Sequence, residues 1–89
     1  MVHFDIKVTG KVQGVYYRIN TRKKAYQCGL TGYVRNEHDG SVLIEAEGTL
    51  ENLNEFVDWC KTGPEGARVD EVIVSSGEMK NYKSFEITG

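Results

Sequence analysis

The sequence has little cysteine and proline and no long apolar run. Its 89 residues include two cysteines and one proline. The cysteines form neither a CxxC pair nor a His/Cys spacing typical of zinc sites, so the common metal motifs are excluded. No segment approaches the roughly 20 apolar residues that a membrane-spanning helix needs. Residues 1–9 alternate apolar and polar side chains, unlike a signal peptide. We therefore expect a cytoplasmic protein with no membrane partner.

Clustered positive charge is also scarce. The formal net charge is −2, and the one basic cluster, Arg22 to Lys24, is short and typical of a solvated helix face. Proteins that bind nucleic acid gather Lys and Arg against the phosphate backbone, so we expect no nucleic-acid partner. The length suits one domain over residues 1–89, built around a single core.

Hydrophobic periodicity predicts the element order β-α-β-β-α-β. Strands are indicated at residues 2–9, 31–36, 41–47 and 69–75, helices at 15–28 and 50–60, and a last β segment within 82–88. Asp39 and Gly40 are a hairpin signal between the second and third strands. This order is that of the ferredoxin-like sandwich, an α+β fold. We expect an antiparallel sheet with both helices on one face.

The segment GKVQGVYYR, residues 10–18, joins the first strand to the first helix. Gly10 and Gly14 permit backbone angles closed to other residues and let a ligand approach the main chain. Unpaired N–H groups at a helix start favour an anion, and Arg18 can add a planar fork for phosphate or carboxylate. The same pattern also fits an ordinary turn with a surface arginine, and spacing alone does not choose between them.

The predicted topology brings Asn36 towards that loop. In a right-handed split βαβ unit the first two strands are parallel, with the third between them. Their ends, at Gly10 and Asn36, should therefore lie roughly 10 Å apart and face a common space. A carboxamide can hold a water molecule but cannot take its proton. Taken alone, an asparagine before a hairpin turn is more simply explained as turn chemistry.

Four motifs together resemble the acylphosphatase family over nearly the whole chain. They are VTGKVQGVYYR (8–18), GLTGYVRNEHDGSV (29–42), Glu47-Gly48 and GPEGARVDEV (63–72). The resemblance implies a free-standing enzyme with the ferredoxin-like fold. Such an enzyme hydrolyses the carboxyl-phosphate bond of acyl phosphates and uses no metal or other cofactor. A monomer that acts on small acyl phosphates is expected.

The resemblance also implies roles for particular residues. Arg18 matches the family's phosphate-binding arginine, and Asn36 matches its water-orienting asparagine. The phosphate cradle, which acts through main-chain N–H groups, corresponds to Val12, Gln13, Gly14, Val15, Tyr16 and Tyr17. The expected reaction is in-line attack on phosphorus by a water held at Asn36, with a phosphate oxygen accepting the proton. The short loops predict a small open site, without a pocket for a large acyl group.

Other reactive side chains are interpreted as structural. Cys28 and Cys60 each lie near the end of a helix, and antiparallel helices would separate them beyond the reach of a disulfide, so two free thiols are expected. His3 is predicted on the open face of the sheet and His38 in an exposed turn, and neither is given a catalytic role.

Two other functions fit the same element order. An RNA-binding domain of the RRM type stacks bases on aromatic residues of an open sheet face. The third strand, SVLIEAE, has no aromatic residue and carries Glu45 and Glu47. A non-catalytic anion sensor would keep the phosphate cradle, but the presence of both Arg18 and Asn36 favours an enzyme.

Overall fold

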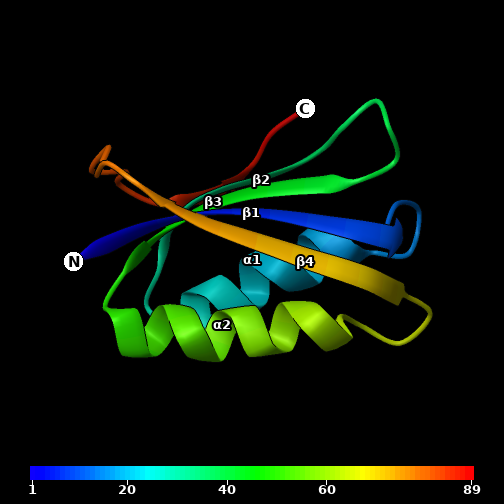
Figure 1. Cartoon of the computed structure of the whole chain (residues 1–89), viewed down its shortest axis with the longest axis horizontal. Coiled ribbons are helices and arrows are strands. Elements are labelled where there is room, and N and C mark those ends of the chain that lie inside the picture. Colours follow the sequence, from blue (N-terminus) through cyan, green and yellow to red (C-terminus); the bar gives the residue numbers. More distant parts are fainter.

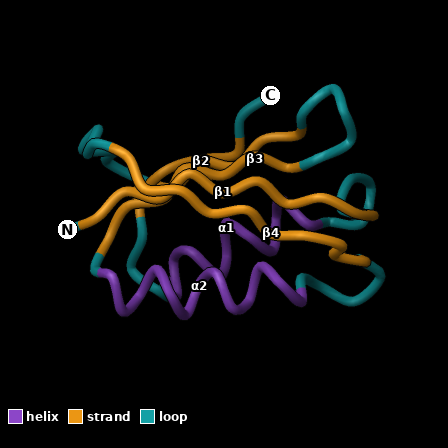
Figure 2. The backbone as a smooth tube through the Cα atoms, in the orientation of Figure 1, coloured by secondary structure: helices purple, strands orange, loops and turns teal.

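The computed structural model describes residues 1–89, which form two helices packed on one side of a five-stranded sheet (Figure 1, Figure 2). In chain order the elements are β1 (Val2–Lys11), α1 (Tyr17–Gln27), β2 (Thr31–Asn36), β3 (Val42–Gly48), α2 (Leu50–Thr62), β4 (Arg68–Gly77) and β5 (Phe85–Ile87). The strand order is β4-β1-β3-β2-β5. The predicted ferredoxin-like α+β sandwich is therefore confirmed. Neither helix has the length and apolar character needed to cross a membrane.

The sheet is mixed, because one of its four strand pairings is parallel and departs from the antiparallel arrangement expected. β5 pairs in parallel with β2, with Gly32 opposite Phe85 and Val34 opposite Ile87, while the other pairings are antiparallel. The last β region divides in two. β4 pairs with β1 at one edge, and residues 78–84 then carry the chain to the opposite edge, where β5 runs in the direction of β2. Alternation marks the faces of a strand but not its partner or its direction.

The core lies between the sheet and the helices, and each helix faces it with buried residues at helical spacing. α1 buries Tyr17, Thr21 and Ala25. α2 buries Leu53, Phe56, Val57 and Cys60. The second helix begins as predicted, because the Thr49 hydroxyl accepts a hydrogen bond from the Asn52 N–H at 3.2 Å.

Both cysteines are free, as predicted, and both are buried. The Tyr17 hydroxyl, at the start of α1, donates to the Cys60 carbonyl near the end of α2 at 2.8 Å. The Cys28 thiol, just beyond α1, lies 3.6 Å from a carboxylate oxygen of Glu55. Burial raises the pKa of both thiols.

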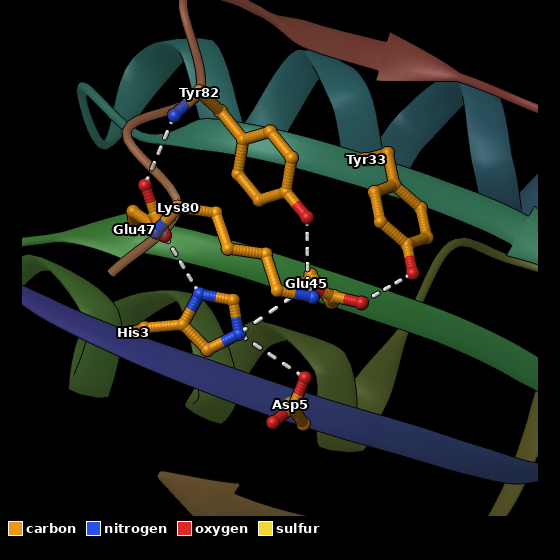
Figure 3. A network of polar contacts seen from close by, with 7 residues as sticks. All are labelled: His3, Asp5, Tyr33, Glu45, Glu47, Lys80 and Tyr82. Atoms are coloured by element: carbon orange, nitrogen blue, oxygen red, sulfur yellow. Dashed lines mark hydrogen bonds and ion pairs between the residues drawn. The ribbon is translucent and has the colours of Figure 1, made fainter. Parts of the chain in front are cut away.

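The sheet face that points away from the helices is not open around His3. His3 is 1% exposed, so the expectation that it projects from an open face is wrong. Its Nδ1 lies 2.7 Å from the Glu47 carboxylate, and its Nε2 lies 3.1 Å from Asp5 and 3.4 Å from Glu45 (Figure 3). His38, in contrast, is exposed in the turn before β3, as predicted.

Residues 80–82 cover this part of the sheet and hold its carboxylates. The Lys80 ammonium lies 2.8 Å from Glu45, and the Tyr82 hydroxyl donates to the same carboxylate at 2.7 Å (Figure 3). The main-chain N–H groups of Lys80 and Tyr82 donate to Glu47 at 2.6 and 3.1 Å. An RRM-type domain needs an open face for base stacking, so this covering disfavours that alternative.

The His3 network predicts that stability changes with pH. Burial opposes protonation of His3, but hydrogen bonds to Glu47 and Asp5, and the charges of Asp5 and Glu45, raise its pKa above the usual 6.5. A group whose pKa rises on folding stabilises the protein fully below its unfolded pKa, and this stabilisation is lost as pH rises through the folded pKa. The melting temperature should therefore fall as pH increases above about 6.5.

His3→Gln, which cannot titrate, should lack this decline, whereas the exposed His38→Gln should retain it. Thermal unfolding of the three proteins between pH 5 and 9 checks this, and an identical decline in His3→Gln would refute it.

The Glu45 carboxylate changes stability with pH in the opposite direction to His3. Burial alone would raise the pKa of Glu45, but hydrogen bonds from Lys80, Tyr33 and Tyr82 lower it to about 2. A carboxyl group whose pKa falls on folding stabilises the protein above its unfolded pKa, and this stabilisation is lost as pH falls towards the folded value. Together with His3, Glu45 places the most stable range between about pH 4.5 and 6.5.

Candidate active site

β1 is irregular near its end, just before the loop that leads to α1. A register shift between Thr9 and Gly10 interrupts the pairing of the two strands, and Gly10 has a φ of 125°. A Cβ atom at Gly10 would lie 2.1 Å from the Arg68 carbonyl oxygen, so only glycine fits there. Gly14, with a φ of 74°, then turns the chain towards α1.

Helix α1 starts with its first N–H groups uncapped by any side chain. Tyr16 is the N-cap residue, in the left-handed conformation with a φ of 62°, and its side chain makes no capping hydrogen bond. α1 therefore begins at Tyr17, two residues later than the sequence predicts. The first turn also contains no acidic residue. Free N–H groups and the helix dipole together favour an anion at this end.

A cavity of about 490 Å³ opens at this helix start and extends to the end of β2. It is lined by Val12, Gly14, Tyr16, Tyr17, Arg18, Ile19, Asn36 and Ile87. The structure thus brings Arg18 and Asn36 onto one cavity, as the topology argument predicts. The cavity is larger than the small open site that the short loops predict. That expectation considered only the loops, whereas α1 and β5 supply part of the wall.

Two residues of the predicted cradle do not line the cavity with their side chains. Gln13 donates from its amide to the carbonyls of Glu37 and Ser41, at 2.8 and 2.9 Å. Val15 packs against the hydrophobic core. Gln13 therefore ties the loop to the turn between β2 and β3, which fixes the loop relative to Asn36.

The two polar side chains of the cavity are poised for a ligand. Arg18 is half-buried, and its side chain, unlike those of Arg22, Arg35 and Arg68, takes part in no hydrogen bond or ion pair within the protein. Asn36 Oδ1 is buried and has no hydrogen-bond partner. A buried acceptor without a partner costs about 1–3 kcal/mol, and such groups in native proteins usually have a functional reason. A positive charge and an unused acceptor therefore meet at one site.

No His, Cys, Asp or Glu lines the cavity, so its side chains do not form a metal-binding set. The donor cluster in the protein that could hold an ion is His3, Asp5 and Glu45. It lies about 25 Å along β1 from the loop, at 3.3 Å per residue. There the Lys80 ammonium already neutralises Glu45. The positive charge at the cavity comes from Arg18 and from main-chain N–H groups.

Comparison with known sequences shows which family this chain belongs to. The sequence profile of the acylphosphatase family, described as "Acylphosphatase", matches residues 4–87. This chain belongs to the acylphosphatase family. It is 58% identical over 69 residues to an acylphosphatase from Marinobacter nauticus, a match that covers 78% of this chain and 75% of that protein. It is 44% identical over 87 residues to one from Archaeoglobus fulgidus, which covers 98% of both chains.

Solved structures agree with this assignment. The crystal structure of an acylphosphatase from Bacillus subtilis aligns over all of both chains with a TM-score of 0.98 at 33% identity. The structure of an acylphosphatase from Coxiella burnetii gives a TM-score of 0.95 at 33% identity and covers 98% of this chain and 92% of that one. The family and the fold predicted from the sequence are both confirmed.

In this acylphosphatase-family chain, sequence reasoning missed two residues of the cavity. Ile19 lies on α1 and is 58% exposed, although it is a large apolar residue. Ile87 lies on β5, whose position beside β2 the alternation does not reveal. The sequence offered one signal for Ile19, which is that an isoleucine directly follows Arg18. A single apolar residue on a protein surface is common, however, so this signal is weak.

Proposed function

We propose that this chain hydrolyses the carboxyl-phosphate bond of small acyl phosphates, giving a carboxylate and phosphate. It acts as a cytoplasmic monomer, with residues 1–89 as one domain. The observation that carries the proposal is the meeting of Arg18 and Asn36 on one cavity at an uncapped helix start. Membership of the acylphosphatase family supports it. Two buried free thiols suit the reducing cytoplasm.

The phosphate group binds to the loop and to Arg18. Main-chain N–H groups of Val12 to Tyr17 donate to its oxygens, as they do in other anion sites at helix starts. The Arg18 guanidinium adds two parallel, charge-assisted hydrogen bonds. This arrangement supplies the positive charge that a metal ion provides in many phosphoryl-transfer enzymes, so no metal is required.

The attacking water is held by Asn36. Its unused Oδ1 accepts a hydrogen bond from the water and directs the water oxygen at phosphorus. The new P–O bond forms as the bond from phosphorus to the acyl oxygen breaks, and the bonding electrons leave with the carboxylate. Asn36 is not a base, so a phosphate oxygen takes the proton. The carboxylate, whose conjugate acid has a pKa near 4, departs without protonation, so no general acid is needed.

Turnover of acetyl phosphate by the purified protein in EDTA tests this proposal. We expect hydrolysis well above that of a heat-denatured sample, and equal rates with EDTA and with added magnesium. Loss of activity in EDTA that magnesium restores would contradict the metal-free mechanism. Binding of inorganic phosphate without any turnover would instead identify an anion sensor.

A further inference from the structure

The cavity that holds Arg18 and Asn36 is larger than a phosphate requires. Its volume is about 490 Å³, whereas a water molecule takes up about 30 Å³ in the liquid. A phosphate has only five heavy atoms and therefore fills a minor part of it. Five of the eight lining residues are apolar or aromatic: Val12, Tyr16, Tyr17, Ile19 and Ile87. The remaining space thus has an apolar wall.

Part of this wall consists of exposed apolar side chains. The protein exposes eight large hydrophobic residues, and three of them border this one cavity. Tyr16 is 75% exposed, Ile19 58% and Ile87 38%. Single exposed apolar residues are ordinary, but several gathered around a concave site mark a binding surface.

The fold fixes the positions of the two isoleucines. The Arg22 side chain donates from Nε to the Phe85 carbonyl at 3.0 Å and so joins α1 to β5. Ile19 lies one helical turn before Arg22 and on the same side of the helix. Ile87 lies two residues after Phe85 and on the same face of the strand. Both isoleucines therefore lie beside the contact between α1 and β5, at the end of that contact that borders the cavity.

Arg18 is the one charged residue that lines the cavity. None of the other seven lining residues carries a charge. An acyl group with its own carboxylate or ammonium would lose hydration there without gaining a partner, which is unfavourable. Methylene groups, in contrast, gain free energy when they are removed from water.

We propose that Tyr16, Ile19 and Ile87 form a subsite for the acyl group and favour acyl phosphates with an extended apolar chain. The inference rests on the proposed function, because it takes an acyl phosphate as the substrate. It adds the substrate class: unbranched or aromatic acyl groups of several carbons, without a second charge.

A series of aliphatic substrates tests this subsite. Acetyl, butanoyl and hexanoyl phosphate have leaving groups of nearly equal acidity, so differences in kcat/KM report contacts with the acyl chain. We expect kcat/KM to rise with chain length and to be about tenfold higher for hexanoyl than for acetyl phosphate, since an open cavity removes only part of each methylene from water.

Two variants test whether the preference for longer acyl chains depends on the apolar cavity wall. In a double variant with Ile19→Ala and Ile87→Ala, the ratio of hexanoyl to acetyl kcat/KM should fall to within about twofold of one, since the chain loses most of its contacts. Leu50→Ala is the matched control: Leu50 is 53% exposed at the start of α2 and lies outside the cavity, so the ratio should stay as in the wild type.

The outcomes separate the two proposals. Turnover of acetyl phosphate with no preference for longer chains, or a preference that the double variant retains, would overturn the subsite alone. Absence of turnover with all three substrates would overturn the proposed function and this inference with it. A tenfold preference that the double variant loses and Leu50→Ala keeps supports the subsite.

Discussion

Replacing Arg18 by glutamine should lower kcat/KM for acetyl phosphate by about a thousandfold or more. The Arg18 side chain makes no hydrogen bond or ion pair within the protein, so its charge is available to the phosphate in both the ground state and the transition state. Glutamine can donate one neutral hydrogen bond but supplies no charge and no bidentate fork. The inhibition constant of inorganic phosphate should therefore rise by at least about tenfold as well.

Lys23→Gln is the matched control for this change. It removes one positive charge from the same helix at an exposed position outside the cavity. Its kcat/KM should stay within about twofold of the wild type, because long-range charge effects are screened by salt. Equal losses in the two variants would show that net charge, rather than the placement of Arg18, governs the rate.

Replacing Asn36 by alanine should lower kcat by about a hundredfold to a thousandfold and leave phosphate binding within about threefold of the wild type. The Oδ1 atom of Asn36 is the buried acceptor without a partner, and it would hold the attacking water instead of the phosphate itself. An interaction gained only as water attacks appears in kcat and not in ground-state binding.

Steady-state kinetics and inhibition by inorganic phosphate measure both quantities on the same samples. Asn54→Ala, at an exposed position of α2, controls for the loss of a carboxamide elsewhere. A large rise in the phosphate inhibition constant for Asn36→Ala would place Asn36 in phosphate binding and contradict its role in positioning water. Unchanged kcat would remove it from the mechanism.

The sequence contains enough local information to predict the elements and their faces. The stripe through Leu53, Phe56 and Cys60 follows the helical period, and these residues are buried in α2. The meeting of Arg18 and Asn36 was also predictable, because the hand of a split βαβ unit places the ends of the first two strands together. Each of these predictions depends on periodicity or on chirality, which are properties of the backbone.

Long-range partners were not predictable in the same way. Nothing in the alternation of residues 85–87 indicates that β5 crosses to the far edge and pairs in parallel with β2. That crossing carries Ile87 to the cavity, and it lays Lys80 and Tyr82 over the carboxylates of Glu45 and Glu47. The position of Ile87 in the cavity wall and the covering of the sheet face around His3 both follow from this one connection.

Hydrolysis of acetyl phosphate by the wild-type protein in ¹⁸O-labelled water, with EDTA present, tests the central claim most directly. If a water held by Asn36 attacks phosphorus, turnover proceeds and the label enters inorganic phosphate, leaving the acetate unlabelled. Mass spectrometry of the two products after a single round of hydrolysis distinguishes them. Label in the acetate would show attack at the carbonyl carbon and would contradict the mechanism derived from Arg18 and Asn36.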